Sequence, residues 1–204
     1  MIRPSALLLP SALVLALAQG PACRWPEPSP PVVFHTLTPL QPAAAPAAPS
    51  GIKVEVLPVR LPEILLRPQM VLAQGSGTLR LSETHRWGNP LDRDMQRVLA
   101  QDLAVLLGSD AVVASPYGDR AGAAFRVQVD VQSCDGRDGQ GLAMKAVWMV
   151  TRADGGPALV VRRTMLREPL PSADPGALAD AHSRILADLA REIAEGLRSC
   201  TKGE

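Results

Sequence analysis

The sequence predicts an α+β domain with a mostly antiparallel β-sheet and two amphipathic helices packed on one face of it. Three observations lead to this fold class. Short runs of alternating or β-branched residues are separated by turns that contain Gly and Pro. Two longer segments repeat apolar residues at every third or fourth position, which is the period of a helix. Along the chain, four expected strands precede the first helix and four more precede the second.

The first 22 residues are predicted to be an export signal and not a part of the fold. Arg3 is followed by an apolar run, residues 6–18, that is too short for a comfortable membrane span. Two cleavage sites at the end of the signal fit the sequence. Ala16-Leu17-Ala18 suits ordinary cleavage before Gln19, whereas Gly20-Pro21-Ala22-Cys23 is similar to a bacterial lipobox, in which Cys23 becomes the lipidated first residue.

Two proline-rich segments divide the rest of the chain. Residues 23–31 are predicted to be the lipidated Cys23 and a semi-rigid stalk, and residues 41–50 a Pro- and Ala-rich loop. Proline fixes φ and lacks an N–H donor, so neither segment can lie inside a sheet. Residues 32–200 therefore form a single predicted domain that includes this loop, and residues 201–204 form a tail.

The strand expected most clearly is 124–133, because its apolar and polar residues alternate strictly. A turn with two glycines joins strands 70–73 and 78–82, and an Ala-Asp-Gly-Gly turn joins strands 142–151 and 158–166, which predicts two hairpins. A further turn is expected over 135–141. The remaining expected strands are 32–37, 52–59 and 111–114.

Both helices carry capping signals. Asn89 is the expected cap of a helix that begins at Pro90 and ends before Gly108. Asp174 is the expected cap of a second helix over 175–199. The apolar stripe of the first helix is Leu91, Met95, Val98, Leu99, Leu103, Leu106 and Leu107, and that of the second is Leu178, Ile185, Leu186, Leu189, Ile193 and Leu197.

Composition and motifs exclude several classes of function. The net charge is +1 without a basic block, which argues against nucleic-acid binding because phosphates demand a cationic patch. No HExxH, GxSxG or phosphate-binding glycine loop occurs, and His35, His85 and His182 stand in separate elements. Asp135 and Asp138 lack the further acids that a calcium loop needs. We therefore expect no enzyme activity, no cofactor and no metal site.

Three cysteines leave one unpaired in an exported protein. If Cys23 carries lipid, Cys134 and Cys200 can pair in an oxidising compartment. Two free thiols fit the sequence as well, because the Cα separation is not visible in it.

The surface candidates for a partner interface are Arg67, Gln69, Arg86 and Trp87. Arg67 precedes a proline and is therefore expected to be extended. Trp and Arg dominate interface hot spots, so a partner-facing patch is one interpretation. In the other, Trp87 covers the start of the first helix and Arg86 is a surface charge or a carboxylate partner.

Four motifs in order give the chain a resemblance to the PqiC family, the auxiliary lipoproteins of ABC-type and MCE-type lipid transport systems. The motifs are Phe34-His35-Thr36-Leu37, Val54-x-Val56-x-Pro58-Val59-x-Leu61-Pro62-Glu63, Leu66-Arg67-Pro68-Gln69-Met70-Val71 and Arg86-Trp87-Gly88-Asn89-Pro90-Leu91. The chain departs from the family at His35, where an aromatic is usual, at Leu66, where an acid is usual, and in its lipobox.

This resemblance implies a lipoprotein anchored through Cys23 at the periplasmic face of the outer membrane, since Arg24 rather than Asp follows the cysteine. It also implies docking onto an MCE-domain protein that bridges from the inner membrane, a homo-oligomeric ring, and a contribution to envelope integrity. Lipid traffic is powered elsewhere, by the ABC ATPase and permease. The alternative is a periplasmic lipid-binding module that itself carries acyl chains.

Overall fold

The computed structural model describes residues 29–42, 51–75, 77–116, 122–137, 139–172 and 174–201. The described residues from Pro31 onward belong to one compact unit. The predicted signal, Cys23, most of the stalk, residues 43–50 of the predicted loop and residues 202–204 of the tail lie outside the described residues.

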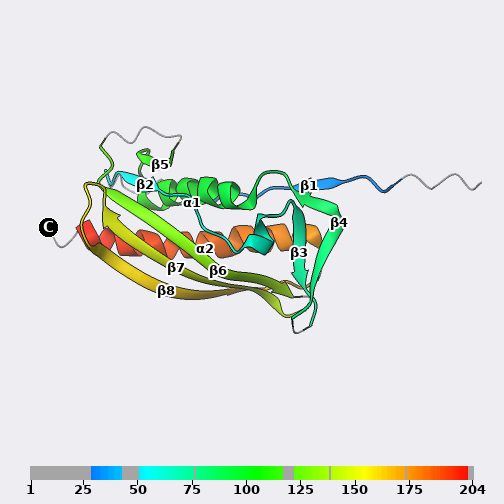
Figure 1. Ribbon diagram of the computed structural model, residues 1–204. Helices are drawn as coiled ribbons and strands as arrows, with labels where there is room; N and C mark the ends of the chain where they lie inside the picture. Colours follow the sequence, from blue (N-terminus) through cyan, green and yellow to red (C-terminus); the bar gives the residue numbers. More distant parts are fainter. Residues whose placement is uncertain are drawn as a thin grey trace, which may run out of the picture. The chain divides into compact units, whose positions relative to one another are not determined.

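The α+β prediction is confirmed in the described part of Pro31–Glu204, where one mixed sheet of eight strands carries two helices (Figure 1). The sheet is built on β6 (Phe125–Arg137), which pairs along its length with β7 (Gly141–Arg152). β7 pairs in turn with β8 (Ala158–Glu168), and both pairings are antiparallel. The turn expected over 135–141 is shorter than predicted, because the ladder continues to the pair of Arg137 and Gly141.

The other edge of β6 is shared by two groups of strands. Near its start, β6 pairs with β2 (Val54–Val56), whose far side carries β5 (Val112–Ala114). Near its end, β6 meets β3 (Gln69–Ala73) through one residue pair. β3 pairs with β4 (Leu79–Trp87), and β1 (Val33–His35) forms the edge beyond β4.

The sheet is antiparallel in its long pairings, whereas the pairings of β1 with β4, β2 with β5, β2 with β6 and β3 with β6 are parallel. Short turns can join only antiparallel neighbours, and parallel neighbours need long connections. β4 runs to Trp87, well past the expected end at Ser82, because β1 pairs with its last residues. β2 is shorter than expected, since Pro58 cannot donate to a ladder.

The helices are α1 (Leu91–Leu107) and α2 (Pro175–Thr201), and a single-turn 3-10 helix covers Glu63–Leu66. Gly108 ends α1 in the left-handed conformation, at φ 58°, as expected. Asp174 caps α2 as expected, because its Oδ2 accepts the N–H of Ala177 at 2.9 Å. The prediction that Asn89 caps α1 is wrong. Pro90 stands at the cap position, and its carbonyl accepts the N–H groups of Arg93 and Asp94.

The core lies between the sheet and the two helices, which also pack on each other. It consists mainly of Val, Leu, Ala and Met, with Trp148 and Phe125 among the few aromatics. Leu106 is the one residue of the two predicted stripes that is only partly buried. Two glycines let α2 approach the sheet: a Cβ at Gly196 would lie 2.8 Å from the ring of Trp148, and one at Gly136 would lie 2.6 Å from Leu178.

Candidate docking surface

The predicted interface residues gather where β1, β4 and β3 meet. Phe34, Arg86 and Gln69 are register partners across the three strands, so their side chains share one face. Arg67 is exposed just before β3, and the N–H of Trp87 donates to the carbonyl of Pro68 at 2.7 Å. We call Phe34, Arg67, Gln69 and Arg86 the corner.

Trp87 does not belong to the exposed part of this corner. Its side chain is 6% exposed, and its ring meets that of His182 edge to face, with centroids 5.2 Å apart. His182 is itself buried in α2, and burial lowers its pKa to about 4. This burial argues against Trp87 as an interface hot spot and fits the other interpretation of the sequence, in which the ring covers the start of the first helix.

Phe34 is the corner residue that the sequence interpretation did not single out. It is 64% exposed in the edge strand β1. The sequence signal that could have identified Phe34 is an aromatic residue in an expected short strand. Exposed aromatic rings are typical of interfaces. Arg86 is half-buried beside it, and its Nε has no hydrogen-bond partner among the described residues.

A histidine pair fastens β1 to β4 below the corner. Nε2 of His35 lies 2.9 Å from Nδ1 of His85, and the two rings stack with centroids 5.2 Å apart. Burial, and then the neighbouring His85, lower the pKa of His35. His35 therefore favours its neutral form, and one ring nitrogen of the pair donates to the other.

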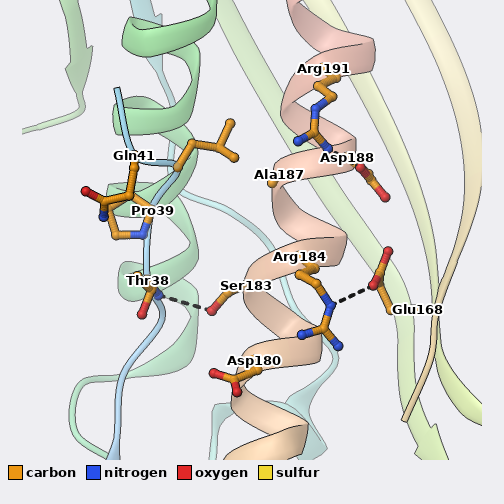
Figure 2. A pocket seen from close by; sticks show the side chains of 11 residues that line it. Thr38, Pro39, Gln41, Glu168, Asp180, Ser183, Arg184, Ala187, Asp188 and Arg191 are labelled. Atoms are coloured by element: carbon orange, nitrogen blue, oxygen red, sulfur yellow. Dashed lines mark hydrogen bonds and ion pairs between the residues drawn. The ribbon is translucent and has the colours of Figure 1, made fainter. Parts of the chain in front are cut away.

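The chain after β1 runs along α1, and Thr38 reaches across to Ser183 of α2 (Figure 2). We call residues 37–41 the strap. The N–H of Leu37 donates to Oδ2 of Asp94 at 2.8 Å, and the guanidinium of Arg97 donates to the carbonyl of Leu37 at 3.0 Å. The same guanidinium pairs with Oδ1 of Asp94 at 2.7 Å. Both backbone groups of Leu37 are thus held by one ion pair.

Two further bonds hold the strap along its length. The N–H of Thr38 donates to the hydroxyl of Ser183 in α2 at 3.1 Å, and the N–H of Leu40 donates to Oδ1 of Asp102 in α1 at 2.7 Å. Asp102 is fully buried, its Oδ2 has no partner among the described residues, and burial raises its pKa to about 6. Acids at positions 94 and 102, two turns apart on the buried side of α1, were the sequence signal for this feature.

A groove of about 400 Å³ lies along α2 beside the strap (Figure 2). Its arginines are already neutralised, because Arg184 pairs with Glu168 at 2.9 Å and Arg191 pairs with Asp188. The groove therefore combines an apolar floor with charged side chains that are already paired with one another. The groove is lined by Thr38, Pro39, Leu40, Gln41, Glu168, Asp180, Ser183, Arg184, Ala187, Asp188 and Arg191.

Within the described ranges, no group of three or more His, Cys, Asp and Glu side chains is arranged to hold a metal ion. Neither α1 nor α2 is long and apolar enough to cross a membrane, as far as the described residues extend.

The pairing of Cys134 with Cys200 is wrong, and both are free thiols. Cys134 stands in β6 two residues before Gly136, which packs against Leu178 at the start of α2. Cys200 stands at the other end of α2, roughly 30 Å further along the helix at its rise per residue. A disulfide needs Cα atoms within about 7 Å. Cys134 is inert as well as distant, since burial raises its pKa to about 12.

The model of the family of ABC-type transport auxiliary lipoprotein components matches residues 35–194 of the chain. No curated protein matches the sequence. The crystal structure of protein XCC0632 from Xanthomonas campestris is 15% identical and covers 80% of this chain and 93% of its own, with a TM-score of 0.65. That of an uncharacterized protein is 16% identical and covers 80% of this chain and 98% of its own, with a TM-score of 0.63. At these identities the likeness shows the fold alone.

A PelC dodecamer from Paraburkholderia phytofirmans is 11% identical and covers 72% of this chain and 92% of its own, with a TM-score of 0.42. This likeness is too distant to bear on the assembly of the present chain.

Proposed function

Because this chain belongs to the family of ABC-type transport auxiliary lipoprotein components, we propose that it is a periplasmic subunit, anchored in the outer membrane, of an MCE-type intermembrane lipid transport system. In this role it docks the MCE-domain protein that bridges from the inner membrane, and so contributes to envelope integrity. Copies of the chain form a ring that matches the symmetry of that partner.

The observation that carries the proposal is the clamped N-terminal segment beside an exposed corner. Residues 33–41, which include β1 and the strap, are held against β4 and the two helices. Nine residues lie between Cys23 and Val33, and a chain of that length reaches at most about 35 Å when fully extended. The corner is therefore presented within that distance of a lipid anchor on Cys23.

The corner has the chemistry of a docking surface. Phe34 is mostly exposed beside Arg86, and Arg67 is exposed just before β3 with no ion pair among the described residues. An aromatic ring with neighbouring guanidinium groups is the composition that dominates interface hot spots.

The anchor is tested by intact-mass spectrometry of protein extracted from membranes. We expect a mature chain that begins at Cys23 and carries acyl mass, and a Cys23→Ala variant that is lost from the outer-membrane fraction. A mature chain that begins at Gln19 without added mass would refute the anchored form.

The docking role is tested by capture of the transport complex on the tagged full chain. We expect Phe34→Glu to reduce capture at least about tenfold without lowering the melting temperature, because a ring that is exposed in the free chain and covered in the docked complex becomes a charge. The matched control is Glu195→Lys, an exposed charge change in the last turns of α2. Capture that is unchanged in Phe34→Glu would exclude the corner as the docking site.

The lipid-carrying alternative has no observation in its favour. Buried apolar side chains fill the space between sheet and helices, and the groove along α2 carries five charged side chains.

A further inference from the structure

β8 is a long strand with one unpaired edge. It runs from Ala158 to Glu168 and pairs only with β7 within the described part of the sheet. An unpaired edge presents a row of backbone N–H and C=O groups that can accept a further strand. Edge strands in monomeric proteins are usually short, twisted away or covered. An exposed edge of this length therefore calls for an occupant.

The outward side chains of β8 make this edge apolar as well as unpaired. Leu159 is 41% exposed, and Val161 and Met165 are each 58% exposed. Across the ladder, Met149 of β7 lies opposite Val161 and Val147 lies opposite Arg163, which continues the apolar surface onto β7. This is the face of the sheet that the helices leave uncovered (Figure 1).

The same face carries only positive charge on β7 and β8. Lys145, Arg163 and Arg167 point outward between the apolar residues, and none has an ion pair within the described residues. The one acid of β8, Glu168, is turned toward α2 and pairs there with Arg184. The occupant that complements this surface is therefore anionic.

A second copy of the chain fits this edge poorly. An antiparallel pair of β8 strands centred on Arg163 would place that residue opposite its own copy, and like charges directly opposite destabilise a sheet. A lipid surface also fits poorly, because hydrocarbon would leave the unpaired backbone groups unsatisfied. An added strand satisfies those groups and the charges together.

We propose that the free edge of β8 binds an extended acidic segment of a protein partner as an additional strand of the sheet. The inference rests on the proposed function, in which the partner belongs to the transport system, and it adds a contact separate from the corner. In antiparallel register the segment has acids opposite Arg167 and Arg163, and apolar residues opposite Met165, Val161 and Leu159.

The probe is a fluorescent peptide with that pattern, Glu-Thr-Val-Thr-Glu-Thr-Val-Thr-Val, titrated against the full chain purified in detergent. We expect saturable binding that weakens with salt, and slower hydrogen exchange of the β8 amides in the complex. A peptide that is N-methylated at every second residue keeps the side chains but loses backbone donors, so it should not bind.

The matched variants have equal net charge. Arg163→Glu with Arg167→Glu should lower the affinity for the acidic peptide by about tenfold or more. The same double variant should bind a peptide with Lys in place of Glu more tightly. Arg80→Glu with Arg93→Glu, at exposed positions away from β8, should leave the affinity unchanged. Equal binding of the Glu and Lys peptides, or full binding of the N-methylated one, would overturn the inference.

Two other outcomes would also overturn it. One is binding to phosphatidylglycerol vesicles that the Arg163 and Arg167 double variant abolishes, without any peptide binding. The other is a dimer, seen by light scattering, that dissociates in the Arg163 and Arg167 double variant. In either case, capture of the transport complex that still depends on Phe34 would leave the proposed function standing.

Discussion

Asp94 is the residue on which the attachment of the N-terminal segment depends most. It is 2% exposed, and its carboxylate accepts the N–H of Leu37 and pairs with Arg97, whose guanidinium holds the carbonyl of Leu37. Asp94→Ala leaves a buried N–H group without an acceptor and takes the ion-pair partner from Arg97. We expect the variant to lose both fold stability and attachment of the strap.

The magnitude follows from the separate contacts. A hydrogen bond to a charged group contributes about 1.5–3 kcal/mol, and the Leu37 bond is buried. The ion pair adds at most about 1 kcal/mol, because the side chain of Arg97 is 43% exposed. We therefore expect Asp94→Ala to lower the free energy of unfolding by about 3 kcal/mol. Asp94→Asn keeps an acceptor for Leu37 and should cost less.

The assay is urea unfolding of the full chain together with hydrogen exchange of the amides of β1 and the strap. The matched control is Asp92→Ala, an acid in the same helical turn with no hydrogen bond to the strap among the described residues, which should cost about 0.5 kcal/mol through the helix dipole. Exchange at Leu37 should accelerate only in the Asp94 variants. Equal destabilisation by Asp94→Ala and Asp92→Ala, or an unchanged rate at Leu37, would refute the reasoning.

Three further predictions concern the core and its titratable groups. Trp87→Ala should lower the free energy of unfolding by about 3–5 kcal/mol in urea unfolding, and a loss below 1 kcal/mol would contradict its burial. Gly196→Ala should cost about 1–3 kcal/mol by the same assay, because its Cβ meets the ring of Trp148; no loss would mean that α2 shifts freely. Urea midpoints across pH test the third. The pKa of Asp102 rises from 3.8 to about 6, so folding binds the proton and stability is lost as the pH rises through that interval. The pKa of His182 falls from 6.5 to about 4, so stability is present above 6.5 and lost as the pH falls through that interval. Asp102→Asn should remove the loss of stability at rising pH, and His182→Gln should remove the loss at falling pH. Variants that keep the pH dependence of the unmodified chain would disprove these two explanations.

The local elements were largely predictable from the sequence because their causes are local. Strict alternation predicted β6, the Ala-Asp-Gly-Gly turn predicted the hairpin of β7 and β8, and the apolar stripes predicted both helices. The caps at Gly108 and Asp174 were also predictable, since each depends on one residue and its neighbours in the chain.

The candidate site was predictable only in part. Gln69 and Arg86 do share a face with Phe34, because the three are register partners, and Arg67 is exposed just before β3. The sequence left two roles open for Trp87, because its exposure depends on the packing of α2 beside it. The cysteine pairing failed for a similar reason: the separation of the two thiols is set by the length and direction of α2.

By itself, the sequence determined the composition of the core, the periods of strands and helices, and the motifs that mark the family. Only the tertiary structure decided that β1 lies parallel to β4, that Asp94 and Asp102 hold the strap, and that β8 keeps a free edge. The physical reason is range. Periodicity and capping are interactions among near neighbours in the chain. Strand order and burial arise from contacts between distant segments. The loops that connect those segments do not determine which strands pair.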